Sequence, residues 1–251
     1  MLRDIKYPGI PAQVVHHVLD ETYYRCIMLC RDTLREYKAG SNQVYGELMP
    51  SLVDKIIDLT GLNEPSTFLD FGSGLGHVVM QLQTGCQGYG FELMPTVSAI
   101  ATWKSELFLE RCRMWGLKCG PFVLMEGDMT TNSLVPDELL GAAGVVLVNN
   151  KAFDATPNLK DGAYVVSLLP LSIHFNGPIT ERNFYDVGHF FDVTTYTSAK
   201  GEASWCHSEQ KYYVCRVDHA GYHTKFRRFG QFRSRRSAQS QGCQWPGCLI
   251  S

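Results

Sequence analysis

The chain has 251 residues, of which 45% are hydrophobic and 19% are charged. This apolar content excludes a disordered or collagen-like chain, and the length favours one α/β domain with appendages over two full domains. The net charge of −2 hides an asymmetry, because residues 1–222 carry 17 basic and 25 acidic groups whereas residues 223–251 carry six basic groups and no acid.

The charge asymmetry predicts a polyanion or an anionic surface as the partner of the C-terminal segment. Its composition, rich in Arg, Ser and Gln between residues 223 and 241, predicts disorder. The cations of this segment are Lys225, Arg227, Arg228, Arg233, Arg235 and Arg236.

The sequence gives no sign of secretion, membrane insertion or metal binding. The first residues are charged where a signal peptide would be apolar, and the longest uncharged stretch, residues 163–180, contains two prolines and polar residues. The nine cysteines are never spaced as Cys-x-x-Cys. We therefore expect reduced thiols in a cytosolic or nuclear protein, and no metal site.

Two helices are expected first, over residues 14–37, where apolar residues recur at three- and four-residue steps, and over residues 48–60, which end at Gly61. Strands are then predicted at residues 67–71, 89–93, 122–125, 145–149 and 163–169, with helices at 78–83 and 96–115. This alternation predicts a parallel sheet with helices on both faces. Residues 190–196 and 212–217 form two further strands with no helix between them, which favours an antiparallel pair at the sheet edge.

A glycine-rich loop is the strongest local signal. A strand runs into Asp70, and Gly72, Gly74 and Gly76 then precede a helix. Glycines at this point let the backbone approach a ligand and turn tightly into a helix N-terminus. The glycine pattern alone is also typical of dinucleotide-binding loops and of turns with a purely structural role.

Acidic residues at the ends of three strands narrow the choice of ligand. Asp70 would repel a pyrophosphate, whereas S-adenosyl-L-methionine carries a sulfonium and an ammonium group. Glu92 ends the next strand, where it can accept both ribose hydroxyls, and Asp128 follows the third, near an adenine amino group. The acids therefore favour S-adenosyl-L-methionine as the cofactor.

The fourth strand ends at Asn149, beside the same crevice. An amide carbonyl there can hold an amine with its lone pair aimed at the sulfonium methyl group, and this positioning supplies much of the acceleration of a displacement. A lysine amine must also be neutral to attack, and an apolar aromatic channel lowers its pKa by desolvation. Phe153, Trp205 and Tyr212 are the candidate walls.

Several motifs together resemble the disruptor-of-telomeric-silencing histone-lysine methyltransferases, which lack the SET fold. In chain order they are Val44-Tyr-Gly-Glu47, Phe68-Leu-Asp-Phe-Gly-Ser-Gly-Leu-Gly76, Gly90-Phe-Glu92, Leu147-Val-Asn-Asn150, Ala203-Ser-Trp205 and Tyr212-Tyr213. The similarity covers about residues 23–217. It implies a Rossmann-like class I methyltransferase fold, a seven-stranded mostly parallel sheet with an antiparallel edge and a small N-terminal helical part.

The resemblance also implies a domain division, a substrate and a compartment. Residues 1–44 would form the helical segment, 45–222 the S-adenosyl-L-methionine-dependent domain and 223–251 the basic tail. The implied substrate is a lysine in the globular core of nucleosomal histone H3, and the implied compartment is the nucleus. The basic tail would contact nucleosomal DNA.

Carried over residue by residue, the resemblance implies two groups of site residues. The cofactor group is Tyr45, Glu47, Asp70, Gly72, Ser73, Gly74, His77, Glu92, Asp128, Met129 and Asn149. The methyl-transfer group is Asn149, Phe153, Trp205 and Tyr212. The sequence departs from the family pattern at Leu48, His77, Lys151, Leu169 and Cys206, mostly around the acceptor mouth.

Two other functions remain possible from the sequence. One is methylation of a non-histone protein or of an RNA amine, and the other is a cofactor-binding scaffold without activity.

The residues Cys248-Leu-Ile-Ser251 have the form of a prenylation box, with Cys243 as a palmitate acceptor and the Arg233–Arg236 cluster as a basic second signal. This pattern would give weak attachment to a membrane.

Overall fold

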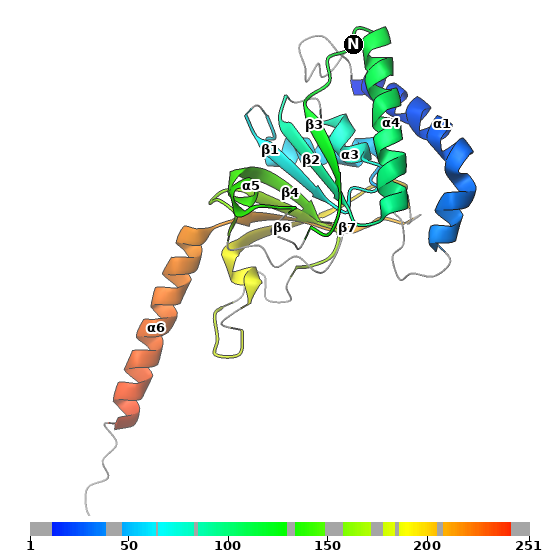
Figure 1. Ribbon diagram of the computed structural model, residues 1–251. Helices are drawn as coiled ribbons and strands as arrows, with labels where there is room; N and C mark the ends of the chain where they lie inside the picture. Colours follow the sequence, from blue (N-terminus) through cyan, green and yellow to red (C-terminus); the bar gives the residue numbers. More distant parts are fainter. Residues whose placement is uncertain are drawn as a thin grey trace, which may run out of the picture.

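The expected strands build one seven-stranded sheet (Figure 1). The computed structural model describes residues 12–38, 47–63, 65–82, 85–129, 134–148, 158–171, 178–183, 186–204 and 208–241. Its elements are α1 (Ala12–Lys38), α2 (Pro50–Thr60), β1 (Thr67–Phe71), α3 (His77–Gln81), β2 (Gln87–Glu92), α4 (Pro95–Met114), β3 (Phe122–Glu126), α5 (Asp137–Ala142), β4 (Ala143–Val148), β5 (Tyr164–Ser167), the 3-10 helix η2 (Val187–Phe190), β6 (Phe191–Thr197), β7 (Lys211–Val217) and α6 (His219–Gln241).

The strand order is β3-β2-β1-β4-β5-β7-β6. Strands β1 to β5 run parallel, whereas β7 is antiparallel to both β5 and β6. This confirms the predicted mostly parallel sheet with an antiparallel edge. The chain moves from β1 towards β3 on one side and from β4 towards β6 on the other, so a ligand crevice is expected outside the carboxyl ends of β1 and β4.

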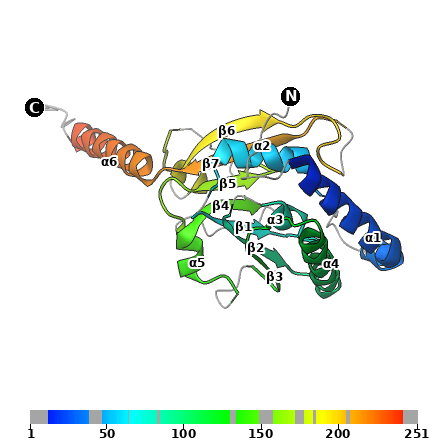
Figure 2. The same ribbon diagram turned by 90° about the horizontal axis from the view of Figure 1, so that it is seen from above.

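Helices cover both faces of the sheet. Figure 2 shows α3, α4 and α1 at one side and α5 at the other. The central strands β1 and β4 are buried on both faces, which explains why the sequence of β4 is entirely apolar and why Asp70 of β1 is a buried charge. Val15, Val18 and Leu19 of α1 join Met80 and Phe108 in one apolar cluster, so α1 packs onto α3 and α4 through a single stripe. None of the described helices combines the length and apolar composition needed to cross a bilayer.

Two elements differ from the expectation. The short helix α5 was not expected, because six residues are too few to show a helical period. The prediction of disorder for residues 223–241 is wrong, since they continue α6 to Gln241. Arg, Gln and Ala all favour helix, so this composition suits a solvated helix as well as a disordered chain. Residues 242–251, including Cys243 and Cys248, lie outside the described part of the chain.

Helix α6 is fixed to the body at its first turns and then extends away from the sheet (Figure 1). The ring of Tyr222 stacks on Phe190 of η2, with centroids 4.1 Å apart. The backbone N–H of His219 donates to Asp161 Oδ1 at 2.9 Å, and that of Gly221 donates to Asp218 Oδ1 at 2.8 Å. These contacts satisfy the exposed amides at the helix start.

A short antiparallel bridge joins the segment before α2 to the segment between β6 and β7. Leu48 pairs with Ala203. The N–H of Met49 donates to the carbonyl of Glu202 at 2.9 Å, and the N–H of Ser204 donates to the carbonyl of Glu47 at 3.0 Å. Backbone hydrogen bonds therefore hold residues 47–49 and 202–204 together.

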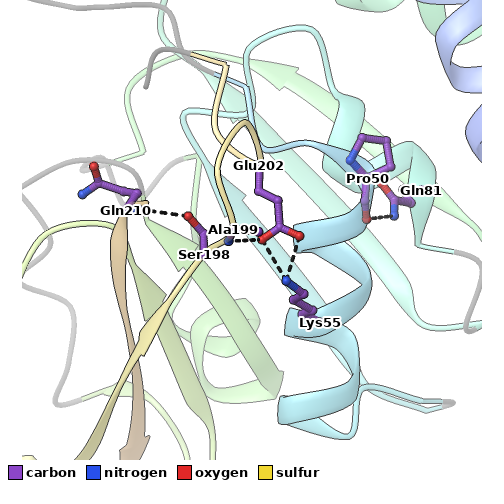
Figure 3. A network of polar contacts seen from close by, with 7 residues as sticks. All are labelled: Pro50, Lys55, Gln81, Ser198, Ala199, Glu202 and Gln210. Atoms are coloured by element: carbon purple, nitrogen blue, oxygen red, sulfur yellow. Dashed lines mark hydrogen bonds and ion pairs between the residues drawn. The ribbon is translucent and has the colours of Figure 1, made fainter. Parts of the chain in front are cut away.

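The Glu202 side chain clamps this bridge to α2 (Figure 3). Lys55 Nζ lies 2.8 Å from both carboxylate oxygens of Glu202, and the N–H of Ala199 donates to Oε2 at 2.7 Å. Burial alone would raise the pKa of Glu202, but the hydrogen bonds from Lys55, Ala199 and the Ser51 hydroxyl lower the pKa on balance. The first residue of α2 is also tied to α3, because Gln81 Nε2 donates to the carbonyl of Pro50 at 2.8 Å.

Glu202→Gln removes the charge that pairs with Lys55 and keeps the shape of the side chain. We expect this variant to lose about 1 kcal/mol of unfolding free energy at pH 7, measured by urea unfolding. Because the fold lowers the pKa of Glu202, its contribution is present above the ordinary glutamate pKa and is lost as the pH falls through the folded-state value. The difference from the wild type should therefore shrink steadily as the pH is lowered below the ordinary glutamate pKa.

The exposed Glu209 provides the matched control, since Glu209→Gln makes the same chemical change outside the clamp. A Glu209→Gln variant as destabilised as Glu202→Gln, or a difference that persists at low pH, would contradict the role given to the ion pair.

Candidate functional site

The glycine loop between β1 and α3 is anchored to the end of β2. The N–H groups of Gly72 and Ser73 donate to the carbonyl of Phe91 at 2.9 and 3.0 Å. Gly72 has φ 85°, a left-handed conformation that favours glycine, and a Cβ added there would meet nothing within 4 Å. Gly76 also has positive φ, 71°, and an added Cβ would lie 2.9 Å from Leu124. The loop is therefore packed at Gly76 and open at Gly72.

Glu92 fixes the loop from the end of β2. Its Oε2 accepts the N–H of Gly74 at 2.9 Å, and its Oε1 accepts the N–H of Met94 at 2.9 Å. Each carboxylate oxygen has a second lone pair. The buried Glu92 can thus hold the loop and still accept ligand hydroxyl groups.

Asp70 lies at the end of β1, opposite Gly90 of β2, and is 3% exposed. Burial, and then the negative charge of Glu92, raise the pKa of Asp70 to about 7. Two neighbouring carboxylates in a crevice repel each other, and a cation placed between them relieves this repulsion. A ligand that carries a positive charge therefore fits this pair of carboxylates. Among the described residues no group of three or more His, Cys, Asp and Glu side chains is arranged to hold a metal ion.

The third predicted acid lies at the same edge of the sheet. The N–H of Gly127 donates to the backbone carbonyl of Glu92 at 2.9 Å, which keeps the ends of β2 and β3 side by side. The side chain of Asp128, which follows directly, is exposed, and Met129 packs against the core cluster that contains Phe91. Asp70, Glu92 and Asp128 therefore lie on, or directly after, three neighbouring strands at one edge of the sheet.

Glu47 reaches this region from the segment before α2. Its backbone is held by the bridge to residues 202–204, and its N–H also donates to Ser204 Oγ at 2.8 Å. The carboxylate of Glu47 accepts a hydrogen bond from the Tyr23 hydroxyl of α1. Burial, followed by the charge of Glu47, raises the pKa of Tyr23 above its ordinary value, so Tyr23 stays protonated and donates.

The side chain of His77 contacts α1 and α4. Its Nδ1 lies 2.7 Å from Lys104 Nζ, and its ring meets the ring of Tyr23 edge-on, with centroids 5.3 Å apart. Burial, and then the charge of Lys104, hold the pKa of His77 well below its ordinary value. The imidazole is therefore neutral and accepts a hydrogen bond from the lysine. Its predicted contact with cofactor stays a prediction.

Tyr212 is the second residue of β7. Because β7 runs antiparallel to β5, its start lies at the carboxyl edge of the parallel strands. Its buried ring stacks on Tyr196, with centroids 5.5 Å apart and an interplanar angle of 21°. Burial, and then the nearby Glu202, raise the pKa of Tyr212. The other predicted residues of the acceptor side and the cofactor loop lie outside the described residues: Tyr45, Asn149, Phe153 and Trp205.

Sequence reasoning missed two polar residues behind the loop, Tyr23 and Lys104. The signal was present for Lys104, because the buried positions of α4 include Val97, Ala101, Lys104 and Phe108 at three- and four-residue steps. A lysine on the apolar stripe of a helix is seldom fully buried unless it is paired. Tyr23 carries no comparable signal, since an aromatic residue at such a position usually packs in the core.

Comparison with known proteins gives matches over most of the chain. Residues 23–217 match the family described as histone methylation protein DOT1. The chain is 33% identical over 221 residues to a Yarrowia lipolytica protein named "Histone-lysine N-methyltransferase, H3 lysine-79 specific", covering 84% of this chain and 44% of that protein. It is 34% identical to a Mycosarcoma maydis protein of the same name, covering 84% of this chain and 28% of that one.

Solved structures with a similar backbone include an RNA methyltransferase from Salinibacter ruber in complex with S-adenosyl-L-homocysteine. Its TM-score is 0.44 at 18% identity, and the match covers 67% of this chain and 92% of that one. Another is an O-methyltransferase from Bacillus cereus, with TM-score 0.48 and 10% identity, covering 80% and 91%.

The family match spans more than half of the chain, while the chain spans less than half the length of these two relatives. The predicted class I methyltransferase fold is confirmed by the sheet order, in which parallel strands end in an antiparallel β7. The glycine loop, the strand-end acids and the Tyr-Gly-Glu segment all fall inside the matched residues. This chain therefore belongs to the DOT1 family of histone methylation proteins.

Proposed function

We propose that the chain transfers a methyl group from S-adenosyl-L-methionine to a lysine in the globular core of nucleosomal histone H3, in the nucleus. The observation that carries the proposal is the buried pair of Asp70 and Glu92 beside the open glycine loop, with Asp128 following the neighbouring strand at the same edge of the sheet. The relatives are named as histone-lysine N-methyltransferases specific for lysine-79 of H3, and we propose the same acceptor for this chain.

The residues at the ends of β1 and β2 fit this cofactor. Asp70 and Glu92 give a paired negative charge for an ammonium group, and the remaining lone pairs of Glu92 suit two adjacent ribose hydroxyls. The loop is open at Gly72, where a ligand would approach the backbone. When bound, the cofactor supplies an electrophilic methyl group on a sulfonium. The chain's own residues bind, orient and desolvate.

The acceptor side rests on residues outside the described part of the chain. Asn149, which follows β4 directly, would orient the lysine amine, and Phe153 and Trp205 would line its channel with Tyr212. Two described features support this assignment. Tyr212 is buried at the correct edge of the sheet, and residue 204 is fixed to Glu47 by two hydrogen bonds. The channel and the cofactor loop would thus share one support.

The basic helix α6 is the proposed contact with nucleosomal DNA. Residues 1–222 are acidic on balance, whereas α6 carries Lys225, Arg227, Arg228, Arg233, Arg235 and Arg236 and no acid. Neutralising DNA phosphates with these cations would release condensed counterions. Attachment to a membrane through Cys248 stays a prediction.

The raised pKa of Asp70 predicts that cofactor binding depends on pH. An ammonium group binds the ionised carboxylate, so we expect affinity for S-adenosyl-L-homocysteine to rise as the pH increases through about 7 and binding near pH 7 to release protons. Titration calorimetry in two buffers of different ionisation enthalpy measures both. In Asp70→Asn the pH dependence should disappear and affinity should fall roughly tenfold or more at pH 8. A variant that kept the wild-type pH profile would exclude Asp70 as the titrating group.

Asn149→Ala should abolish methyl transfer and leave cofactor binding unchanged, because the amide orients the amine rather than the adenosine. Transfer is measured with labelled S-adenosyl-L-methionine and nucleosomes, and binding by calorimetry. Asp70→Asn is the contrasting variant, since it should lose binding and transfer together. If Asn149→Ala lost cofactor affinity in parallel, the role assigned to it would be wrong.

Truncation after Tyr222 keeps the stack on Phe190 and removes all six cations of the C-terminal segment. We expect weaker nucleosome binding, unchanged cofactor binding, and loss of a salt dependence with a logarithmic slope of up to about −5. A full-length variant with the six cations changed to Gln separates charge from length, and it should behave like the truncated protein. Equal nucleosome affinity of the truncated protein at low salt would remove the proposal for α6.

A further inference from the structure

Lys104 is a buried cation directly behind the glycine loop. It lies on the buried stripe of α4 and has an exposed fraction of 0%. Its Nζ lies 2.7 Å from His77 Nδ1 and 3.4 Å from the carbonyl oxygen of Leu75, and it sits 5.7 Å from the centroid of the Tyr23 ring. Burying an ammonium group costs free energy, so a fully buried lysine calls for a function.

The hydrogen bond to Leu75 fixes the orientation of one peptide plane in the loop. In a trans peptide the carbonyl and the following N–H point in opposite directions. The carbonyl of Leu75 points inwards to Lys104, and the N–H of Gly76 donates to the carbonyl of Ser73 at 2.8 Å, which closes the turn. Lys104 therefore supports the loop from the inside while Glu92 holds it at Gly74.

The charge of Lys104 is as important as its hydrogen bonds. The titratable groups that face it are Asp20, Tyr23 and Cys26 of α1, Glu47 of the bridge segment and His77 of α3. Burial lowers the pKa of Lys104 to about 8, although Glu47, Cys26 and Asp20 act in the opposite direction. Because this pKa lies above 7, Lys104 is mostly protonated at pH 7, and the neutral His77 accepts its hydrogen bond. A positive charge therefore remains behind the loop.

The amino-acid part of the proposed cofactor needs such a charge. It carries an ammonium group, which Asp70, Glu92 and Glu47 can serve, and also a carboxylate, which the same acids would repel. The loop amides of Gly72, Ser73 and Gly74 are already engaged with Phe91 and Glu92. A positive charge behind the loop would offset the repulsion of the carboxylate.

We propose that Lys104 is a positioning residue that selects the amino-acid part of the cofactor, by holding the loop through Leu75 and His77 and by placing a positive charge behind it for the cofactor carboxylate. The inference rests on the proposed cofactor. It adds a residue that does not touch the cofactor and acts through the loop.

The test compares two probes that differ only in the amino-acid part. S-adenosyl-L-homocysteine carries it, and 5′-methylthioadenosine lacks it. In Lys104→Met we expect affinity for S-adenosyl-L-homocysteine to fall about tenfold and affinity for 5′-methylthioadenosine to change less than twofold, both measured by calorimetry at pH 7. Lys104→Gln, which keeps a donor but no charge, should show the same loss.

Lys160→Met is the matched control, because Lys160 also donates to a carbonyl, that of Ala142, at 2.8 Å, but at the opposite end of β4. It should bind both probes as the wild type does. Equal losses for both probes in Lys104→Met would indicate a collapsed loop and overturn the proposal. Wild-type affinity in Lys104→Gln would overturn the claim for charge.

A pH series separates the positioning role from a role in stability. In the wild type, affinity for S-adenosyl-L-homocysteine should fall as the pH rises through about 8, relative to Lys104→Met and relative to 5′-methylthioadenosine. Stability should respond in the opposite sense, because a lysine pKa lowered by folding makes the fold relatively more stable as the pH rises above about 8. Parallel pH profiles in wild type and Lys104→Met would overturn the proposal. Failure of the wild type to bind S-adenosyl-L-homocysteine at all would instead overturn the proposed cofactor.

Discussion

The burial of two carboxylates side by side is the constraint on which the rest of the site depends. Asp70 and Glu92 end neighbouring parallel strands, so the sheet itself forces them together, and burial and mutual repulsion raise the pKa of Asp70 to about 7. Two backbone N–H groups, of Gly74 and Met94, donate to Glu92 and stabilise its carboxylate. The paired carboxylates are preorganised for a cation, and their repulsion lowers the stability of the free protein until a cation binds.

Two supports hold the residues of this site in place. The polar cluster of Tyr23, His77 and Lys104 connects α1, α3 and α4. The bridge between residues 47–49 and 202–204, clamped by Lys55 and Glu202, connects the segment of Glu47 to the segment that precedes residue 205. Glu47 belongs to both supports, because its backbone joins the bridge and its carboxylate accepts from Tyr23. A shift of α1 would therefore displace both the glycine loop, through His77, and residues 202–204, through Glu47.

The strand order and the place of the glycine loop could be predicted from the sequence, whereas contacts that depend on how helices and loops pack could not. Asp70, Glu92 and Asp128 were predictable because parallel strands end at one edge, which follows from strand order alone. The burial of Lys104 was not, since it depends on how α1 packs across α4. Nor was the pairing of Leu48 with Ala203, because a single bridge leaves no period in the sequence. Helix α6 was mistaken for a disordered tail because helix propensity and solvation use the same residue types.

The central claim is that this family member acts on a lysine in folded, nucleosomal histone H3. The most direct measurement offers labelled S-adenosyl-L-methionine to nucleosomes, free histones and RNA at equal concentration, followed by mass-spectrometric mapping of the methylated residue. The account predicts label on one lysine of the globular part of H3 in nucleosomes, with far less on free histones and none on RNA. Label on RNA or on a flexible histone tail, or no label on any of the three, would contradict it.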